Sequence, residues 1–140
     1  METVSYVHTL NYLYDKTGRP FPKLLLQLTN PKDSEQTVET DAYLDSGAEC
    51  SLFKADLALA IGLDLNSGQK KEYGSLVKGA GVEARLHWVR LSHPELGDFD
   101  LEIGFTESPI SRNLLGRDFF NLIQIGFRER YLTFYVTPAP

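Results

Sequence analysis

Cysteine is almost absent from this sequence, because Cys50 is the only one among 140 residues. An internal disulfide and a cysteine-based metal site are therefore excluded, and a reducing, cytoplasmic setting is expected. Positive charge is also scarce: the formal net charge is −5, so nucleic-acid binding is not expected. No run approaches the roughly 18 apolar residues of a membrane span, and no basic start precedes an apolar stretch, so no membrane partner is expected either.

Two further patterns of catalytic chemistry are missing. The three histidines, His8, His87 and His93, do not form a zinc-binding spacing, and we expect neither a metal nor a cofactor. The stretch YGSLV at 73–77 is not the Gly-x-Ser-x-Gly turn of a serine hydrolase. Cys50 has no cationic neighbour in the sequence that would activate a thiol, and it is expected to be a small, buried apolar side chain.

Long helices and internal repeats are absent, and short strand patterns take their place. The alternation of Val38, Thr40, Ala42 and Leu44 is typical of a half-buried strand. Similar patterns predict strands at 23–29, 37–45, 84–92, 99–105, 123–127 and 131–136, with a polar loop at 30–36 and a turn at 93–98. At this length, the pattern favours one mostly β domain, a barrel or a sandwich.

Only two segments have helical character. Phe53, Leu57 and Ile61 lie at helical spacing, with Gly62 as a stop, so a helix is predicted over 54–61. A second short helix is expected after Gly116. Between them, the glycine-rich stretch 66–84 predicts turns or a hairpin whose backbone approaches something closely.

The predicted strand 37–45 delivers an aspartate into a turn, in the segment LDSGAECSLF at 44–53. The N–H groups of Gly47 and Ala48 could hold the Asp45 carboxylate, and the hydroxyl of Ser46 could lock the turn. Two carboxylates that share one proton can activate water and protonate a leaving group, so one aspartate in this position is half of a hydrolytic centre. Asp-Ser-Gly also suits an ordinary turn, and that reading stays open.

Together with a second segment, NLLGRDFF at 113–120, the Asp45 segment resembles the motifs of the retropepsin-like aspartic proteases. That family has an Asp-Ser/Thr-Gly-Ala motif, here with Ser51 as its later polar residue. About seventy residues on, it has a Gly-Arg-Asp segment, which matches Gly116, Arg117 and Asp118. The helix at 54–61 makes the layout most similar to cellular and bacterial members. Taken alone, Arg117 and Asp118 could also be a surface pair at a helix start.

The resemblance implies a closed β-barrel of the acid-protease type over 23–137, preceded by an N-terminal extension, 1–22, that adds a strand or joins an interface. It also implies a homodimer that cleaves peptide or protein substrates, because each subunit supplies one Asp45 to a shared centre. The Ser46 hydroxyl is expected to bond across the dimer, and Arg117 to form an ion pair with Glu49.

A mobile hairpin that covers the substrate is the remaining implication of the resemblance. Its tip would lie in 74–84, with Val77, Gly79, Ala80 and Gly81 contacting the peptide; a plain surface loop is the alternative.

Two other classes of protein stay open at this point. The same fold can serve as a catalytically silent module for peptide binding or dimerisation. A small, unrelated β-barrel with a chance motif would instead be a monomer with Asp45 on an isolated turn.

Overall fold

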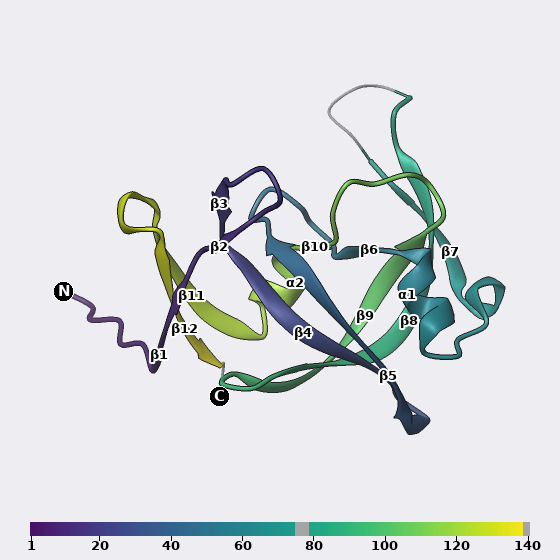
Figure 1. The fold of residues 1–140 in the computed structure, drawn as a ribbon, viewed down its shortest axis with the longest axis horizontal. Coiled ribbons are helices and arrows are strands. Elements are labelled where there is room, and N and C mark those ends of the chain that lie inside the picture. Colours follow the sequence, from purple (N-terminus) through teal and green to yellow (C-terminus); the bar gives the residue numbers. More distant parts are fainter. Residues whose placement is uncertain (75–78, 139–140) are drawn as a thin grey trace.

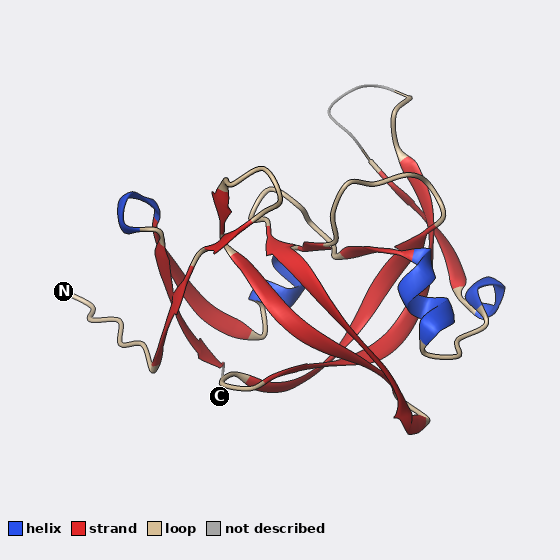
Figure 2. Cartoon of the chain, viewed as in Figure 1, coloured by secondary structure: helices blue, strands red, loops and turns tan. Residues whose placement is uncertain are grey.

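The structure, a computed structural model, describes residues 1–74 and 79–138, and most of its regular structure is strand (Figure 2). In chain order the strands are β1 (His8–Asn11), β2 (Leu13–Tyr14), β3 (Pro20–Phe21), β4 (Lys23–Asn30), β5 (Asp33–Leu44), β6 (Leu52–Lys54), β7 (Gln69–Tyr73), β8 (Val82–His93), β9 (Gly97–Thr106), β10 (Leu114–Leu115), β11 (Ile123–Arg128) and β12 (Thr133–Pro138). The prediction of a mostly β chain is confirmed.

Two short α-helices interrupt the strands: α1 (Ala55–Ala60) and α2 (Arg117–Phe120). Single turns of 3₁₀ helix form η1 (Leu65–Ser67) and η2 (Glu129–Tyr131). Just beyond α1, Gly62 has a φ of 77°, a left-handed conformation that favours glycine, so the predicted stop is confirmed. In the part of the chain that the structure describes, no helix is long and apolar enough to cross a membrane.

Most strands belong to one sheet with the order β4-β5-β10-β6-β9-β8-β7, and β4 also pairs with β8. The strands from β4 to β8 in this order therefore form a ring of hydrogen-bonded neighbours, to which β7 adds an outer strand. Figure 1 shows this ring surrounding the middle of the molecule, with α1 and α2 next to it. The short strand β10 is parallel to β5 and antiparallel to β6, so it joins the two segments that flank the Asp45 turn.

The core fills the inside of this ring. On β4, Leu24, Leu26 and Leu28 are buried, whereas Leu25 points outward and is 60% exposed. This alternation is the period of two that a strand imposes on its side chains. Phe53, Phe105, Phe119 and Phe134 are the largest fully buried side chains.

The N-terminal segment does not lie apart from the rest of the chain. Strand β1 pairs antiparallel with β12, which pairs in turn with β11, and β2 pairs with β3. Tyr12, between β1 and β2, is buried in the core, and its hydroxyl donates a hydrogen bond of 2.9 Å to Glu129. The boundary at residue 22 stays a prediction.

One expected loop is largely a strand. Residues 30–36 were predicted as a polar loop, but β5 begins at Asp33 and a two-residue turn at Pro31 and Lys32 connects it to β4. The Asn30 side chain accepts a hydrogen bond from the Lys32 N–H at 2.9 Å and supports this turn. The first three residues of β5 are exposed. A strand whose side chains face water needs no apolar residues. The polar composition of 33–36 was therefore wrongly interpreted as a loop.

Candidate active site

Asp45 directly follows the last residue of β5. Its backbone N–H donates a hydrogen bond of 2.9 Å to the carbonyl of Leu115, the last residue of β10. Because β5 and β10 run parallel, with Leu44 opposite Leu115, both chains leave the sheet at the same edge. The Asp45 turn and the Gly116 segment therefore emerge side by side, and Asp45 is half-buried between them and solvent.

The turn orients the carboxylate of Asp45. The N–H of Gly47 donates to Asp45 Oδ1 at 2.8 Å, as expected from the sequence. The N–H of Ala48 was expected to do the same, but it donates to the backbone carbonyl of Asp45 at 3.2 Å and closes the turn. Among the described residues, no hydrogen bond links Asp45 to a second carboxylate. The Ser46 side chain is exposed beside it.

The Gly116 segment packs directly against this turn. The N–H of Arg117 donates to the carbonyl of Ala48 at 2.8 Å. A Cβ added to Gly116 would lie 2.6 Å from that same carbonyl oxygen and 3.0 Å from the carbonyl carbon of Cys50. Only glycine leaves room for this approach, so close backbone contact is the physical reason for a glycine at 116.

Ser51 and Asp118 join the two motifs inside the protein. The Asp118 carboxylate accepts hydrogen bonds from the Ser51 N–H at 2.9 Å and from the Ser51 hydroxyl at 2.7 Å. The hydroxyl oxygen also accepts a bond from the N–H of Gly116 at 3.1 Å. Ser51 is completely buried. Every polar group in this small network has a partner, which is the condition for a buried polar network to stabilise a fold.

The expected ion pair between Glu49 and Arg117 is absent from the described residues, whose salt bridges lie elsewhere. Both side chains are exposed, where such a pair contributes only about 0–1 kcal/mol. Backbone contact and the Ser51–Asp118 bonds join the motifs instead. Sequence reasoning had placed Ser51 and Asp118 in the site, but it missed that they bind each other.

Strands β7 and β8 form a hairpin beside the Asp45 turn, with Tyr73 opposite Val82. Gly79 has a φ of 82°, and a Cβ on Gly81 would lie 2.6 Å from the Tyr73 carbonyl, so both glycines are required by the backbone. Val77, the other apolar residue predicted for the tip, lies outside the described residues. Hairpin geometry agrees with the reading of 66–84 as a hairpin.

A hollow of about 560 Å³ separates this hairpin from the Asp45 turn. The described residues that line it are Gly47, Ala48, Glu49, Cys50, Leu52, Lys71, Glu72, Tyr73, Gly74, Ala80, Val82, Ile110 and Leu114. The Tyr73 hydroxyl donates to the carbonyl of Ser51 at 2.9 Å, and burial raises its pKa far above 10, so it stays protonated. This hollow can hold an extended segment of chain against the turn.

The structure also corrects the expectation for Cys50. Its thiol is half-buried in the wall of this hollow, and the ammonium group of Lys71 lies 3.2 Å from the sulfur. The sequence next to Cys50 gave no sign of this contact, because Lys71 lies on β7, far from Cys50 in the chain.

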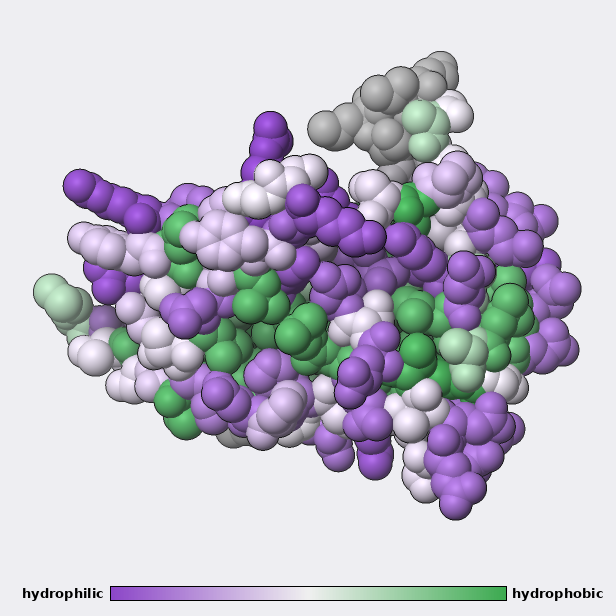
Figure 3. Space-filling view, viewed as in Figure 1, coloured by the Kyte–Doolittle hydropathy of each residue, from purple (hydrophilic) through white to green (hydrophobic). Residues whose placement is uncertain are grey.

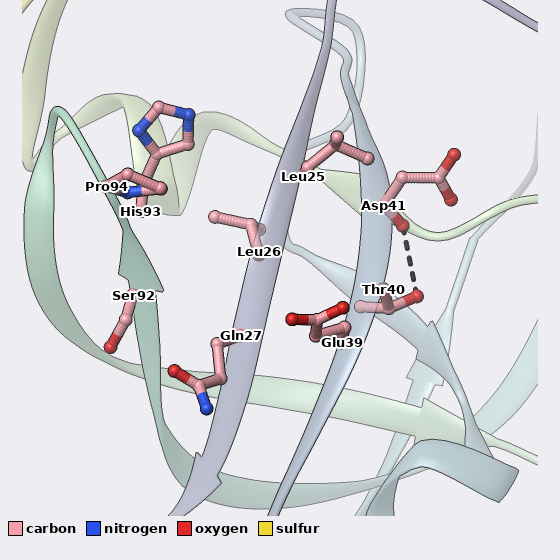
Figure 4. A pocket seen from close by; sticks show the side chains of 9 residues that line it. All are labelled: Leu25, Leu26, Gln27, Glu39, Thr40, Asp41, Ser92, His93 and Pro94. Atoms are coloured by element: carbon pink, nitrogen blue, oxygen red, sulfur yellow. Dashed lines mark hydrogen bonds between the residues drawn. The ribbon is translucent and has the colours of Figure 1, made fainter.

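A second hollow of similar size lies on the outer face of β4 and β5, away from the Asp45 turn (Figure 4). Leu25, Glu39, Asp41 and His93 are among its lining residues. Figure 3 shows apolar residues across the middle of this face of the molecule, with hydrophilic residues above and below. His93 accepts hydrogen bonds from the N–H groups of Glu95 and Leu96 through Nδ1, so its role here is to shape the β8–β9 turn.

Comparison with solved structures shows that this fold is that of the retropepsin-like aspartic proteases. A crystal structure of a retropepsin-like aspartic protease from Rickettsia conorii matches with a TM-score of 0.66 and 15% identity, over 99% of this chain and 98% of that one. EIAV protease, in complex with the inhibitor HBY-793, matches with a TM-score of 0.50 and 16% identity, over 78% and 92% of the two chains. Protein-family models and curated proteins give no match. The likeness confirms the mostly β, retropepsin-like fold predicted from the two motifs.

Proposed function

We propose that this protein is a homodimeric aspartic endopeptidase in which Asp45 of two identical chains forms the catalytic pair. One observation carries the proposal: a fold shared with aspartic proteases holds one aspartate at the start of a turn that a segment about seventy residues away fixes in place. Asp45 is a half-buried carboxylate with no second carboxylate bonded to it among the described residues, so it is suited to meet a twin across a two-fold axis.

The chemistry follows from the proximity of two carboxylates. At about 3 Å they cannot both be ionised, so the pair holds one proton. The ionised Asp45 accepts a proton from a water molecule as that water attacks the peptide carbonyl. The protonated Asp45 donates to the carbonyl oxygen, and a proton is then transferred to the leaving nitrogen as the carbon–nitrogen bond breaks.

The other predicted site residues serve this pair. Gly47 orients the carboxylate, and Ser51, Gly116 and Asp118 fix the turn from below. In this proposal the exposed hydroxyl of Ser46 bonds to the partner chain and stiffens both turns. The β7–β8 hairpin, with Gly79 to Gly81 near its tip, covers a peptide in the hollow and shields it from water.

The remaining expectations are part of the same proposal. The ring of strands from β4 to β8 serves as a closed barrel, residues 23–137 form the catalytic domain, and β1 in residues 1–22 covers the edge of β12. A cytoplasmic location is consistent with a half-buried single cysteine.

The test compares wild-type protein with Asp45→Asn on a peptide library between acidic and neutral pH, with products identified by mass spectrometry. We expect cleavage by the wild type and a loss of at least about a hundredfold in the variant, because asparagine can neither accept nor donate the proton. Circular dichroism and sedimentation should show an unchanged fold and dimer. A hydroxyl-bearing transition-state mimic of the pepstatin kind should raise the melting temperature of the wild type.

Asp98→Asn is the matched control, because Asp98 is an exposed aspartate in the β8–β9 hairpin with no side-chain hydrogen bond among the described residues. It should cleave as the wild type does. Wild-type rates in Asp45→Asn, or cleavage by a protein that sedimentation shows to be a monomer, would contradict the proposal. Capture of peptides without any cleavage would instead identify a binding module.

A further inference from the structure

A third hollow lies near the Asp45 turn, and it is rich in positive charge. It has a volume of about 470 Å³ and lies between the β2–β3 turn, the ends of β5 and β6, and the segment before β10. Its lining residues include four cations, Lys16, Lys23, Lys54 and Arg112, and two carboxylates, Asp15 and Asp41. We call it the cationic hollow. Its local excess of two positive charges contrasts with the net charge of −5 on the whole chain.

The cationic hollow and the hollow under the β7–β8 hairpin share no lining residue, but both are lined by neighbouring residues of the same two segments. Leu52 lines the hairpin hollow and Lys54 lines the cationic hollow, and these two residues share one face of β6 because a strand alternates its side chains. At the start of β10, Leu114 lines the hairpin hollow, whereas the preceding residue, Asn113, lines the cationic hollow. Figure 1 shows β3 and the β7–β8 hairpin rising from the same side of the molecule, with β10 between them.

The cationic hollow is also close to the catalytic turn. Tyr43 lines it and lies two residues before Asp45, which is about 7 Å along a strand. The N–H of Tyr43 donates to the carbonyl of Asn113 at 2.9 Å, so Arg112, in the bend just before β10, lies next to Tyr43. A peptide held at Asp45 therefore has side chains within reach of Arg112.

One of the four cations and both carboxylates already have hydrogen-bond partners in the protein. The Lys23 ammonium is buried and lies 2.8 Å from Asp41 Oδ2. Asp15 uses Oδ1 to accept bonds from the N–H and hydroxyl of Thr17 and from the N–H of Arg19. Its carboxylate shapes the β2–β3 turn and faces no cation in an ion pair.

Arg112 is the cation best placed to bind a ligand. Its guanidinium lies over the rings of Tyr43 and Phe21, with centroid distances of 4.5 Å and 5.2 Å. Stacking on two rings fixes the plane of the guanidinium and leaves its N–H edge available. Among the described residues, Arg112 forms no ion pair with a carboxylate. A fixed guanidinium edge is matched to a carboxylate, which it can bind through two hydrogen bonds.

We propose that the cationic hollow binds an acidic side chain of the substrate, aspartate or glutamate, close to the bond that is cut. Arg112 is the main contact and Lys54 the second positive charge. This inference rests on the proposed peptidase function, whose chemistry needs only a peptide bond, and it adds the class of peptide that the enzyme selects.

The experiment uses a peptide that the wild-type dimer cleaves, prepared with glutamate, glutamine or lysine at each position near the cut. At one position we expect kcat/KM for glutamate to exceed that for glutamine roughly fivefold, and lysine to be poorest, as partly exposed charge-assisted bonds imply. High salt should reduce the ratio. The glutamate-to-glutamine ratio should fall toward one in Arg112→Gln, and less far in Arg112→Lys, which keeps the charge but loses the planar edge.

Arg19→Gln is the matched control. The substitution removes an exposed positive charge next to the β2–β3 turn, and Arg19 does not line the hollow. It should keep the wild-type ratio. Binding of fluorescently labelled glutamate and glutamine peptides to Asp45→Asn protein gives the same comparison without turnover.

Cleavage without discrimination between glutamate and glutamine, or discrimination that survives in Arg112→Gln, would overturn the inference and leave the peptidase proposal intact. Discrimination in binding without any cleavage would support the acidic-ligand site and overturn the peptidase.

Discussion

Two turns of this molecule carry acidic or basic side chains, and they are held in opposite ways. The β8–β9 turn is local: His93 accepts bonds from Glu95 and Leu96, and Gly97 takes a φ of 89°. The Asp45 turn depends on residues about seventy positions away, through Leu115, Gly116 and Asp118. A local turn only reverses the chain, whereas a turn fixed by distant segments can hold a carboxylate at a set place for chemistry.

The largest expected effect comes from substituting the glycine that brings the distant segments together. Gly116→Ala places a methyl group 2.6 Å from the Ala48 carbonyl, against backbone that cannot move aside. We expect a loss of about 3 kcal/mol in the free energy of unfolding. Chemical denaturation at a fixed protein concentration measures this, because a dimer's stability depends on concentration.

Gly97→Ala sharpens the comparison from the local side. No atom lies within 4 Å of its added methyl group, so only the left-handed backbone is strained, at about 1 kcal/mol. Gly74→Ala, with open space and no positive φ, is the neutral control. Equal losses for Gly116→Ala and Gly97→Ala would remove the distinction between the two turns.

Ser51→Ala tests the buried link between the two motifs. It removes the hydroxyl that donates to Asp118 and accepts from Gly116, so the buried Gly116 N–H loses its partner, whereas Asp118 Oδ1 keeps the bond from the Phe119 N–H. We expect a loss of about 2 kcal/mol, together with lower peptidase activity from a loosened Asp45 turn. Ser67→Ala, at an exposed serine that bonds only to a nearby carbonyl, is the control. A Ser51→Ala variant with wild-type stability and wild-type kcat would show that the Ser51–Asp118 bonds do not position the Asp45 turn.

The smallest effect is a dependence of stability on pH at the local turn. Burial lowers the pKa of His93 below the ordinary 6.5. Well above pH 6.5 the histidine is neutral in the folded and in the unfolded chain, and its contribution to the free energy of unfolding is fully present. As the pH falls through 6.5, the unfolded chain binds a proton first, and stability is lost until the pH reaches the lower folded pKa.

His93→Asn should flatten this part of the stability curve, because the asparagine oxygen can accept the same N–H bonds without titrating. Denaturation midpoints between pH 7 and pH 5 measure the difference from the wild type. If the midpoint depended on pH equally in both proteins, His93 would have the same pKa in the folded and the unfolded chain.

Regular alternation allowed much of the fold to be predicted. The strands near 23–29, 84–92 and 99–105 and the helix at 54–61 were all placed within a few residues. The start of β5 was not predicted, and β1 and β7 were expected only as a strand within 1–22 and a hairpin within 66–84, without bounds. These strands lie at edges, where burial does not select their side chains. The short strands β6 and β10 have too few residues for any period to appear.

The candidate site was predicted as two sets of residues rather than as a geometry. Asp45, Gly47, Ser51, Gly116 and Asp118 were all named, because their residue types and order resemble a known pair of motifs. The expected contact between Glu49 and Arg117 was wrong for the described chain. Lys71 beside Cys50, and Arg112 over two rings, were not anticipated, because nothing in a linear sequence signals that these residues meet.

By itself, the sequence determined most of the segments that become strands and the places where the chain must turn. It also determined that one aspartate lies in a turn and is followed by small residues. These features depend on neighbouring residues, through side-chain period, glycine and turn chemistry. Only the tertiary structure decided that Ser51 meets Asp118, that Ala48 lies against Gly116, and that Arg112 stacks beside the turn. Such contacts join residues far apart in the chain, and packing of the whole ring of strands brings them together.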